Sequence, residues 1–374
     1  MSILHSIFVS AKGGVVTDTF EGKLLGVVEG CTNPESAEML DDGETFVFGN
    51  CALGVGYPWF RDGAGLAYLE GRAFVSRARV SADGVVSLEE RHLVDGLTAT
   101  LGCDVVRVGT AMFPAGTVLM AAGGKPVTRD GSGPVDARPH VLAFDPATGE
   151  VLGRIPLWDG SQLARRFNGL EMPNGLAVGT DGVLYVTDCP HTNPSPDPAA
   201  PPPVPPAVYA IPPESFGALV NDEPGAADAV RRVVMPGYVN GATVSPADGT
   251  CWVVSCSETD PVKGGVYNLA PSAFESGVQP PPVHHGLGLL DGVGVTRRGT
   301  VLAGNALTNE IHAFTAHGDH LIVTGEHLPT QMPADFNVVY PRCLDGEPAL
   351  LVPDIRVPSD RGSANVAVLA VPGL

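Results

Sequence analysis

The sequence predicts an all-β fold, a six-bladed β-propeller, from its composition and an internal repeat. The 374-residue chain contains 47 Gly and 35 Pro, which interrupt long helices, and no long stretch has helical periodicity. Only 17% of the residues are charged, less than the usual fraction of about one quarter. A sequence motif recurs at Glu35, Asp104, Asn174, Asn240, Asp291 and Asp335. It starts with an oxygen-bearing side chain and continues into a strand. Six units spaced 44 to 70 residues apart, each with room for several strands, are typical of a propeller.

Each unit is expected to contain the same order of strands. The lead residue precedes a short apolar strand such as 175–178, a turn follows, and a second strand such as 183–186 comes next. A hairpin then completes the unit, and residues 140–155 give its clearest example, two apolar runs around a turn that contains Gly. Equivalent hairpins are expected to start at 207–211, 265–269 and 310–314, and residues 64–94 supply the hairpin of the first unit.

The ends of the chain are expected to close the ring. Residues 365–371 form a strand pattern, as do residues 6–10 and 24–28. We predict that both termini share one blade, because this arrangement hides strand edges that would otherwise be exposed. Residues 1–374 are then one propeller domain, with a Pro-rich loop at 193–206 inserted within a blade.

Charge and hydropathy limit the classes of partner. The net charge of −19 and the pI near 4.8 argue against nucleic acid, because an acidic surface repels phosphate. No run of about 20 apolar residues predicts a membrane span. The N-terminus lacks a secretory signal pattern and the seven cysteines form no C-x-x-C pair, so we expect a cytoplasmic location. The expected partner is a small-molecule substrate, and the oligomeric state is left open.

The lead residues of four units predict a metal site. In a ring of blades, Glu35, Asn174, Asn240 and Asp291 would converge on the axis. Two carboxylates and two carboxamides suit a hard divalent cation, with Ca²⁺ as the expected ion. Mn²⁺ and Mg²⁺ are alternatives, and Zn²⁺ is less natural because the set has no Cys or His. Asn-Gly and Asp-Gly are also ordinary turn sequences, and Glu35 could be a solvated loop carboxylate.

Several further residues are candidates for catalysis or substrate binding. Asp291 is a candidate general base, and His284 and His285, shortly before it, are candidates for proton transfer unless they are simply exposed to solvent. The candidate substrate-binding residues are Trp59, Asp104, Glu171, His191 and Asn337.

The repeat resembles the senescence marker protein / gluconolactonase / luciferin-regenerating enzyme family. The resemblance implies a six-bladed propeller with one axial divalent cation, usually Ca²⁺. The family's ligands are a Glu in the first blade and then an Asn, an Asn-Gly and an Asp-Gly, which match Glu35, Asn174, Asn240 and Asp291. The second unit contributes no ligand in the family. Many of its sugar lactonases also have an Arg ahead of the first Asn, whereas residues 171–173 here are Glu-Met-Pro.

These features predict a metal-dependent hydrolase, a lactonase that opens a small cyclic ester. The cation would polarise the ester carbonyl, and water would attack it. The missing Arg and the aromatic residues of 51–62 keep a second hypothesis open, a metal-dependent cyclase, isomerase or condensation enzyme acting on a natural-product intermediate. A third hypothesis is a non-catalytic propeller that binds a small molecule.

Overall fold

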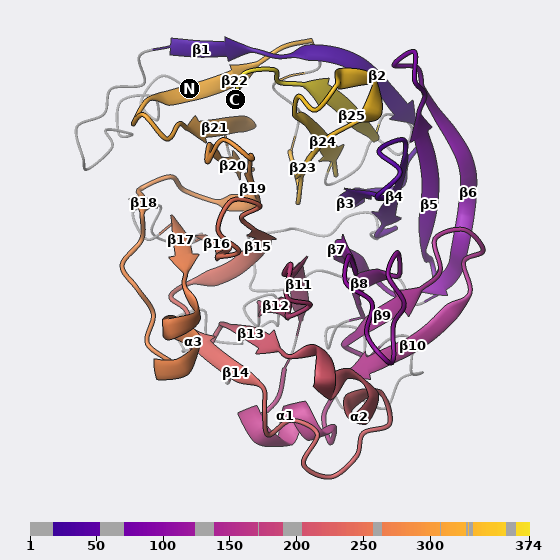
Figure 1. Ribbon diagram of the computed structural model, residues 1–374, viewed down its shortest axis with the longest axis vertical. Coiled ribbons are helices and arrows are strands. Elements are labelled where there is room, and N and C mark those ends of the chain that lie inside the picture. Colours follow the sequence, from indigo (N-terminus) through magenta and orange to yellow (C-terminus); the bar gives the residue numbers. More distant parts are fainter. Residues whose placement is uncertain are drawn as a thin grey trace.

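The predicted six-bladed propeller is confirmed by a computed structural model (Figure 1). The structure describes residues 18–52, 71–123, 138–170, 172–189, 204–256, 264–306, 308–326, 328, 332–356 and 364–374. Strands in these residues form six sheets that stand around a common axis, and consecutive blades follow one another along the chain. In each sheet, the strand nearest the axis is called the inner strand below.

The first three blades run in simple chain order from the inner strand outward. The first contains β3 (Pro34–Met39), β4 (Thr45–Asn50), β5 (Ala73–Val80) and β6 (Val86–Leu97). The second contains β7 (Thr100–Val105), β8 (Val118–Ala122), β9 (His140–Phe144) and β10 (Val151–Pro156). The third contains β11 (Pro173–Val178), β12 (Leu184–Asp188), β13 (Ala207–Ile211) and β14 (Arg231–Val234).

The other three blades complete the ring. The fourth contains β15 (Tyr238–Val244), β16 (Cys251–Cys256), β17 (Gly265–Leu269) and the short β18 (His284–His285). The fifth contains β19 (Leu290–Val295), β20 (Val301–Asn305), β21 (Glu310–Phe314), β22 (His320–Thr324) and β1 (Asp18–Glu21). The sixth contains β23 (Asn337–Val339), β24 (Ala349–Asp354), β25 (Asn365–Ala370) and β2 (Lys23–Glu29).

Short helices occupy connections at the outer parts of blades. They are α1 (Gln162–Phe167), α2 (Phe216–Val220) and α3 (Pro271–Ser276), with a 3₁₀ turn at Pro213–Ser215. A second 3₁₀ turn, Arg342–Leu344, connects β23 to β24. No helix among the described residues is long and apolar enough to cross a membrane. The predicted hairpin at 140–155 is confirmed as β9 and β10, and the expected hairpin starts are β13, β17 and β21.

The N-terminal segment joins two neighbouring blades. As predicted, the termini share a blade, since β2 pairs antiparallel with β25, with Lys23 opposite Ala370. The sequence did not predict β1, which runs parallel to β22 and covers the outer edge of the fifth blade. Gly22, between the two strands, donates its backbone N–H to the Thr324 carbonyl at 2.7 Å. Residues 6–10 lie outside the described residues.

Apolar clusters fill the interfaces between neighbouring sheets. Phe46 and Leu351, for example, lie in one cluster between the first and sixth blades, and Tyr185 and Val253 lie in one between the third and fourth. Each of these side chains is buried. Because every sheet packs on two neighbours, the core is a closed belt that holds the inner strands in fixed positions.

Glycines let the inner strands approach one another at one level of the ring. A Cβ on Gly102 would lie 2.6 Å from the Asn174 carbonyl oxygen, and a Cβ on Gly175 or Gly241 would meet the carbonyl oxygen of Asn240 or Asp291 even more closely. Only glycine fits where backbones come this close. In the first blade, Ser36 stands at this level, and its hydroxyl donates to the Leu101 carbonyl. The small residue that follows each lead residue is therefore what brings the lead residues together.

Candidate metal centre

Strand register defines which residues occupy equivalent places in the blades. In the first five blades, the inner strand pairs with the second strand, breaks register over the next two residues, and then pairs again. The residue directly before this break forms a pair in each case: Pro34, Thr100, Pro173, Val239 and Leu290. The next residue in each blade is then Glu35, Leu101, Asn174, Asn240 and Asp291. Irregular pairing of this kind changes the direction in which the local side chains point.

Four predicted ligands therefore share one level of the ring. Glu35, Asn174, Asn240 and Asp291 stand at the same register position in blades one, three, four and five, at the start of each inner strand. We call this side of the ring the lead end. Glu35, Asn174 and Asp291 are buried, with 4%, 6% and 8% of their surfaces exposed.

Each of the four side chains has a buried oxygen without a hydrogen-bond partner among the described residues. These atoms are Glu35 Oε2, Asn174 Oδ1, Asn240 Oδ1 and Asp291 Oδ1. A buried polar atom without a partner costs free energy, and several in one place require an explanation. Carboxylate and carboxamide oxygens are the donors that Ca²⁺ takes, so the chemistry of the four atoms fits a hard cation.

The electrostatics of the lead end also fit a cation. Burial raises the pKa of Glu35 well above its ordinary range, and the carboxylates of Asp291 and Asp335 raise it further. Burial raises the pKa of Asp291 to about 7, against a hydrogen bond from Asn240 that lowers it. Carboxyl groups that repel one another in a dry site become ionised when a cation is bound among them.

Asp335 is a third carboxylate near this level, and the sequence analysis did not include it in the site. Its backbone N–H donates to the Glu35 carbonyl at 2.9 Å, and its Oδ1 is also buried without a partner. That oxygen lies 2.7 Å from the position that a Cβ on Gly241 would occupy, so the side chain points toward the fourth blade. Its placement as the lead residue of the sixth unit is wrong by one residue, because the Pro333–Asp354 bridge gives that place to Ala334.

The second unit was also misaligned. Leu101, not Asp104, occupies the lead position in β7, so the side chain at this position of the second blade is apolar. Asp104 lies three residues further along the strand. Its carboxylate accepts backbone N–H groups from Val105 at 2.6 Å and Val178 at 2.7 Å. The bond from Val178 ties the second blade to the third.

The remaining candidates do not join the four lead residues. His284 and His285 form β18 at the outer edge of the fourth blade, where the His284 ring stacks on Phe314 with centroids 3.7 Å apart. Asn337 lies beyond the lead level, and its side-chain amide donates to the Ala37 carbonyl at 2.9 Å. Trp59, Glu171 and His191 lie outside the described residues.

Polar contacts behind the lead residues fix the backbone that carries them. The Thr187 hydroxyl accepts the Gly175 N–H at 2.7 Å and donates to the Asn240 carbonyl at 2.7 Å. It thereby links the backbone next to Asn174 with the backbone of Asn240. Asp188 accepts the Met172 N–H at 2.7 Å on the other side of Asn174. Supporting contacts of this kind set the orientation of ligands and are a common feature of metal sites.

Comparison with known proteins supports the fold. No family model matches the sequence, and no curated protein matches it. A gluconolactonase from Xanthomonas campestris is similar in structure, with a TM-score of 0.54 and 20% identity over 93% of this chain and 91% of its own. A candidate gluconolactonase has a TM-score of 0.48 and 14% identity over 96% and 94% of the two chains, and the Dos1 propeller has 0.43 and 8% over 89% and 70%. The similarity to the first of these structures supports the propeller fold over nearly the whole of this chain.

Proposed function

We propose that this protein is a divalent-cation-dependent hydrolase of the lactonase type, with Ca²⁺ as its ion. The observation that carries the proposal is the set of four buried oxygens without partners, contributed by four blades at one register position. Glu35, Asn174, Asn240 and Asp291 would hold the ion. An all-oxygen donor set favours Ca²⁺ over Zn²⁺, which prefers nitrogen and sulfur.

A bound cation of this kind polarises an ester carbonyl and stabilises the oxyanion that forms when water attacks. The chain supplies the proton acceptor. A carboxylate has two oxygens, so Asp291 can contribute one to the ion and receive a proton from water on the other. The hydrogen bond from Asn240 helps to fix the orientation of that carboxylate. Glu35 and Asp335 lie near this carboxylate, and burial together with the charge of Asp291 raises the pKa of each well above its ordinary range.

The proposed substrate is a small cyclic ester. A gluconolactonase among proteins of the same fold supports this reaction class. The sequence Glu171-Met172-Pro173 lacks the Arg that precedes the first Asn ligand in many sugar lactonases. We therefore propose a lactone less polar than a sugar-acid lactone.

A lactone panel in a pH-indicator assay tests the proposal. The wild-type protein, freed of metal by chelation and then supplied with Ca²⁺, should release acid from at least one lactone. Chelation should remove the activity. Asn174→Ala and Asp291→Ala should abolish both turnover and Ca²⁺ binding, because each removes one of the four oxygens.

Two exposed residues of the same types provide matched controls. Asn221→Ala and Asp83→Asn change an amide and a carboxylate far along the chain from the lead residues, and both should retain full activity. Full activity in Asp291→Ala would contradict the proposal. A panel without any turnover, combined with tight Ca²⁺ binding, would instead favour the cyclase, isomerase or condensation class.

A further inference from the structure

A cavity opens at the opposite side of the ring, which we call the far end. It is formed by residues at or just after the carboxyl ends of the inner strands, whereas the lead residues stand at their start. Its volume is about 270 Å³. Glu38 lies three residues beyond Glu35, a distance of about 10 Å along a strand. The cavity is therefore separate from the metal centre, and Asp104 and Asn337 belong to its lining.

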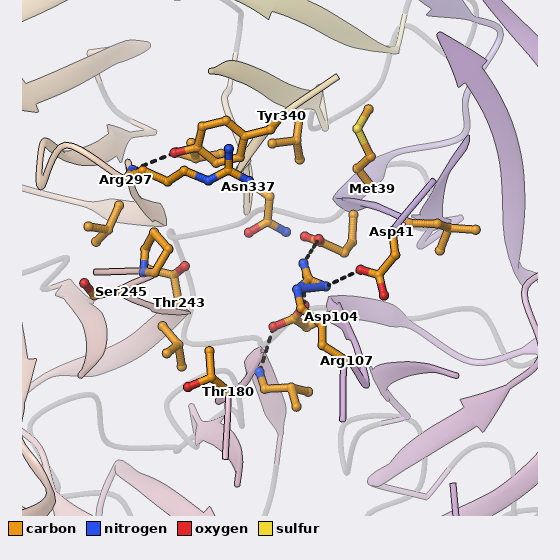
Figure 2. Close-up of a pocket in the computed structure, with 18 of the residues that line it drawn as sticks. Met39, Asp41, Asp104, Arg107, Thr180, Thr243, Ser245, Arg297, Asn337 and Tyr340 are labelled. Atoms are coloured by element: carbon orange, nitrogen blue, oxygen red, sulfur yellow. Dashed lines mark hydrogen bonds and ion pairs between the residues drawn. The ribbon is translucent and has the colours of Figure 1, made fainter. Parts of the chain in front are cut away.

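One wall of this cavity is acidic. Arg107 Nη2 lies 2.9 Å from Glu38 and 3.7 Å from Asp104, and Arg107 Nη1 lies 3.5 Å from Asp41 (Figure 2). Three carboxylates thus surround one guanidinium, which leaves this wall with an excess of negative charge when all are ionised. The Glu38 side chain is 7% exposed, and this burial raises its pKa well above the ordinary range, against the Arg107 guanidinium that lowers it.

The facing wall carries a cation without a carboxylate partner. The Arg297 guanidinium lies over the Tyr340 ring, 3.7 Å from its centroid, and the Arg297 backbone N–H donates to the Tyr340 hydroxyl at 2.6 Å (Figure 2). Among the described residues, no carboxylate forms an ion pair with Arg297. Stacking on the ring holds the guanidinium in place and leaves its N–H groups free to bind an anion.

The lining of the cavity also includes apolar side chains. Val178, Val244, Val295 and Val338 line it, and the Thr243 and Thr180 side chains add hydroxyl groups. A ligand that fits these features has a positive group at one end, a negative group at the other and a short hydrocarbon segment between them.

We propose that the far-end cavity binds a small zwitterion, an amino acid whose ammonium and carboxylate groups are separated by a short alkyl chain. The ammonium lies against Glu38, Asp104 and Asp41, and the carboxylate pairs with Arg297. This site is independent of the metal centre and of the proposed hydrolase activity.

A series of ω-amino acids tests this assignment. Glycine, β-alanine, 4-aminobutyrate and 5-aminopentanoate are titrated separately into the full-length protein by calorimetry. Affinity should depend on chain length, because the spacing of the two charged walls is fixed. Butyrate and n-butylamine, each with one of the two charges, should bind at least about tenfold more weakly than the best amino acid, as expected when a charge-assisted hydrogen bond is missing.

Neighbouring arginines provide a matched pair of variants. Arg297→Gln should lower the affinity for the best amino acid about tenfold or more and leave the affinity for n-butylamine unchanged. Arg298→Gln should change neither affinity, because Arg298 is paired with Glu347 at 2.8 Å and does not line the cavity. Asp41→Asn should lower the affinity for both the amino acid and n-butylamine.

Three outcomes would overturn the assignment. One is the absence of binding by every member of the series to wild-type protein. Another is equal affinity for butyrate, n-butylamine and the amino acids. The third is unchanged amino-acid affinity in Arg297→Gln, with the fold of that variant verified by its melting temperature.

Discussion

The two ends of the ring use the same inner strands, but the carboxylates at the two ends differ in whether they have a cationic partner. At the lead end, carboxylates and carboxamides have buried oxygens with no partner among the described residues. At the far end, Glu38, Asp41 and Asp104 share Arg107, which lies among them. The fold thus supplies a cation of its own to the far-end carboxylates, whereas no cationic side chain among the described residues pairs with Glu35 or Asp291. The unpaired oxygens of the lead end are therefore a specific feature and not a general property of the axis.

The largest effect is expected from closing the space between inner strands at the lead end. Gly241→Ala would place a methyl group against the Asp291 carbonyl and 2.7 Å from Asp335 Oδ1. Backbone cannot move aside as a side chain can, so we expect a loss of about 3 kcal/mol in the free energy of unfolding and loss of ion binding. Urea denaturation measures the first quantity.

A glycine in open space is the control for that change. Gly217 lies in α2, and a Cβ there would meet nothing within 4 Å. Gly217→Ala should leave stability unchanged or raise it by up to about 1 kcal/mol, because alanine favours a helix. Equal behaviour of the two variants would show that the inner strands are not in close contact at the lead end.

A somewhat smaller effect is expected from the ion itself. Ca²⁺ at about 100 times its dissociation constant should stabilise the wild-type protein by about 2.7 kcal/mol, since it binds only the folded state. Asp291→Asn removes one negative charge and should lose most of this gain in a thermal melt. A Ca²⁺-induced shift of equal size in both proteins would place the ion elsewhere.

The pH dependence of the metal-free protein tests the burial of the lead-end carboxyl groups. Burial raises the pKa of Asp291 to about 7 and also raises the pKa of Glu35. The folded state then holds protons that the unfolded state releases, so stability is greatest below about pH 4 for these groups and falls as pH rises through 7. Melting temperatures should show this fall, and Asp291→Asn should reduce it. Stability that rises over the same range in wild type and variant alike would contradict this account.

The smallest of these effects concerns the far end. Arg107→Gln leaves the buried Glu38 carboxylate without its cation, at a cost of about 1–3 kcal/mol in the free energy of unfolding. Arg298→Gln breaks an exposed pair with Glu347 and should cost less than about 1 kcal/mol. If the two variants are equally stable, Arg107 does not stabilise the buried Glu38 carboxylate as described.

The sequence predicted the fold and four lead residues because their signals are local. An oxygen-bearing residue followed by Gly or Ser appears at Glu35, Asn174, Asn240 and Asp291, and the close approach of inner strands requires such a small neighbour. Asp104 and Asp335 were misaligned because the break in strand register that fixes the lead position leaves no mark in the sequence.

Features that depend on distant pairing were not predictable from the sequence. The parallel addition of β1 to β22 joins residues about 300 positions apart, and nothing in the pattern of either segment specifies the partner. His284 and His285 precede Asp291 closely in sequence, yet strand pairing with β17 holds them at the outer edge of a blade. The far-end cavity combines residues from all six blades, so it becomes visible only when the ring is assembled.

Equilibrium dialysis of the purified protein against Ca²⁺ tests the central claim most directly, because it counts ions without any assumption about the reaction. We predict one tightly bound Ca²⁺ per chain in the wild-type protein and in Asn221→Ala, and none in Asn174→Ala. An absence of bound Ca²⁺ in the wild type, or an undiminished ion in Asn174→Ala, would contradict the assignment of the four lead residues as a metal centre.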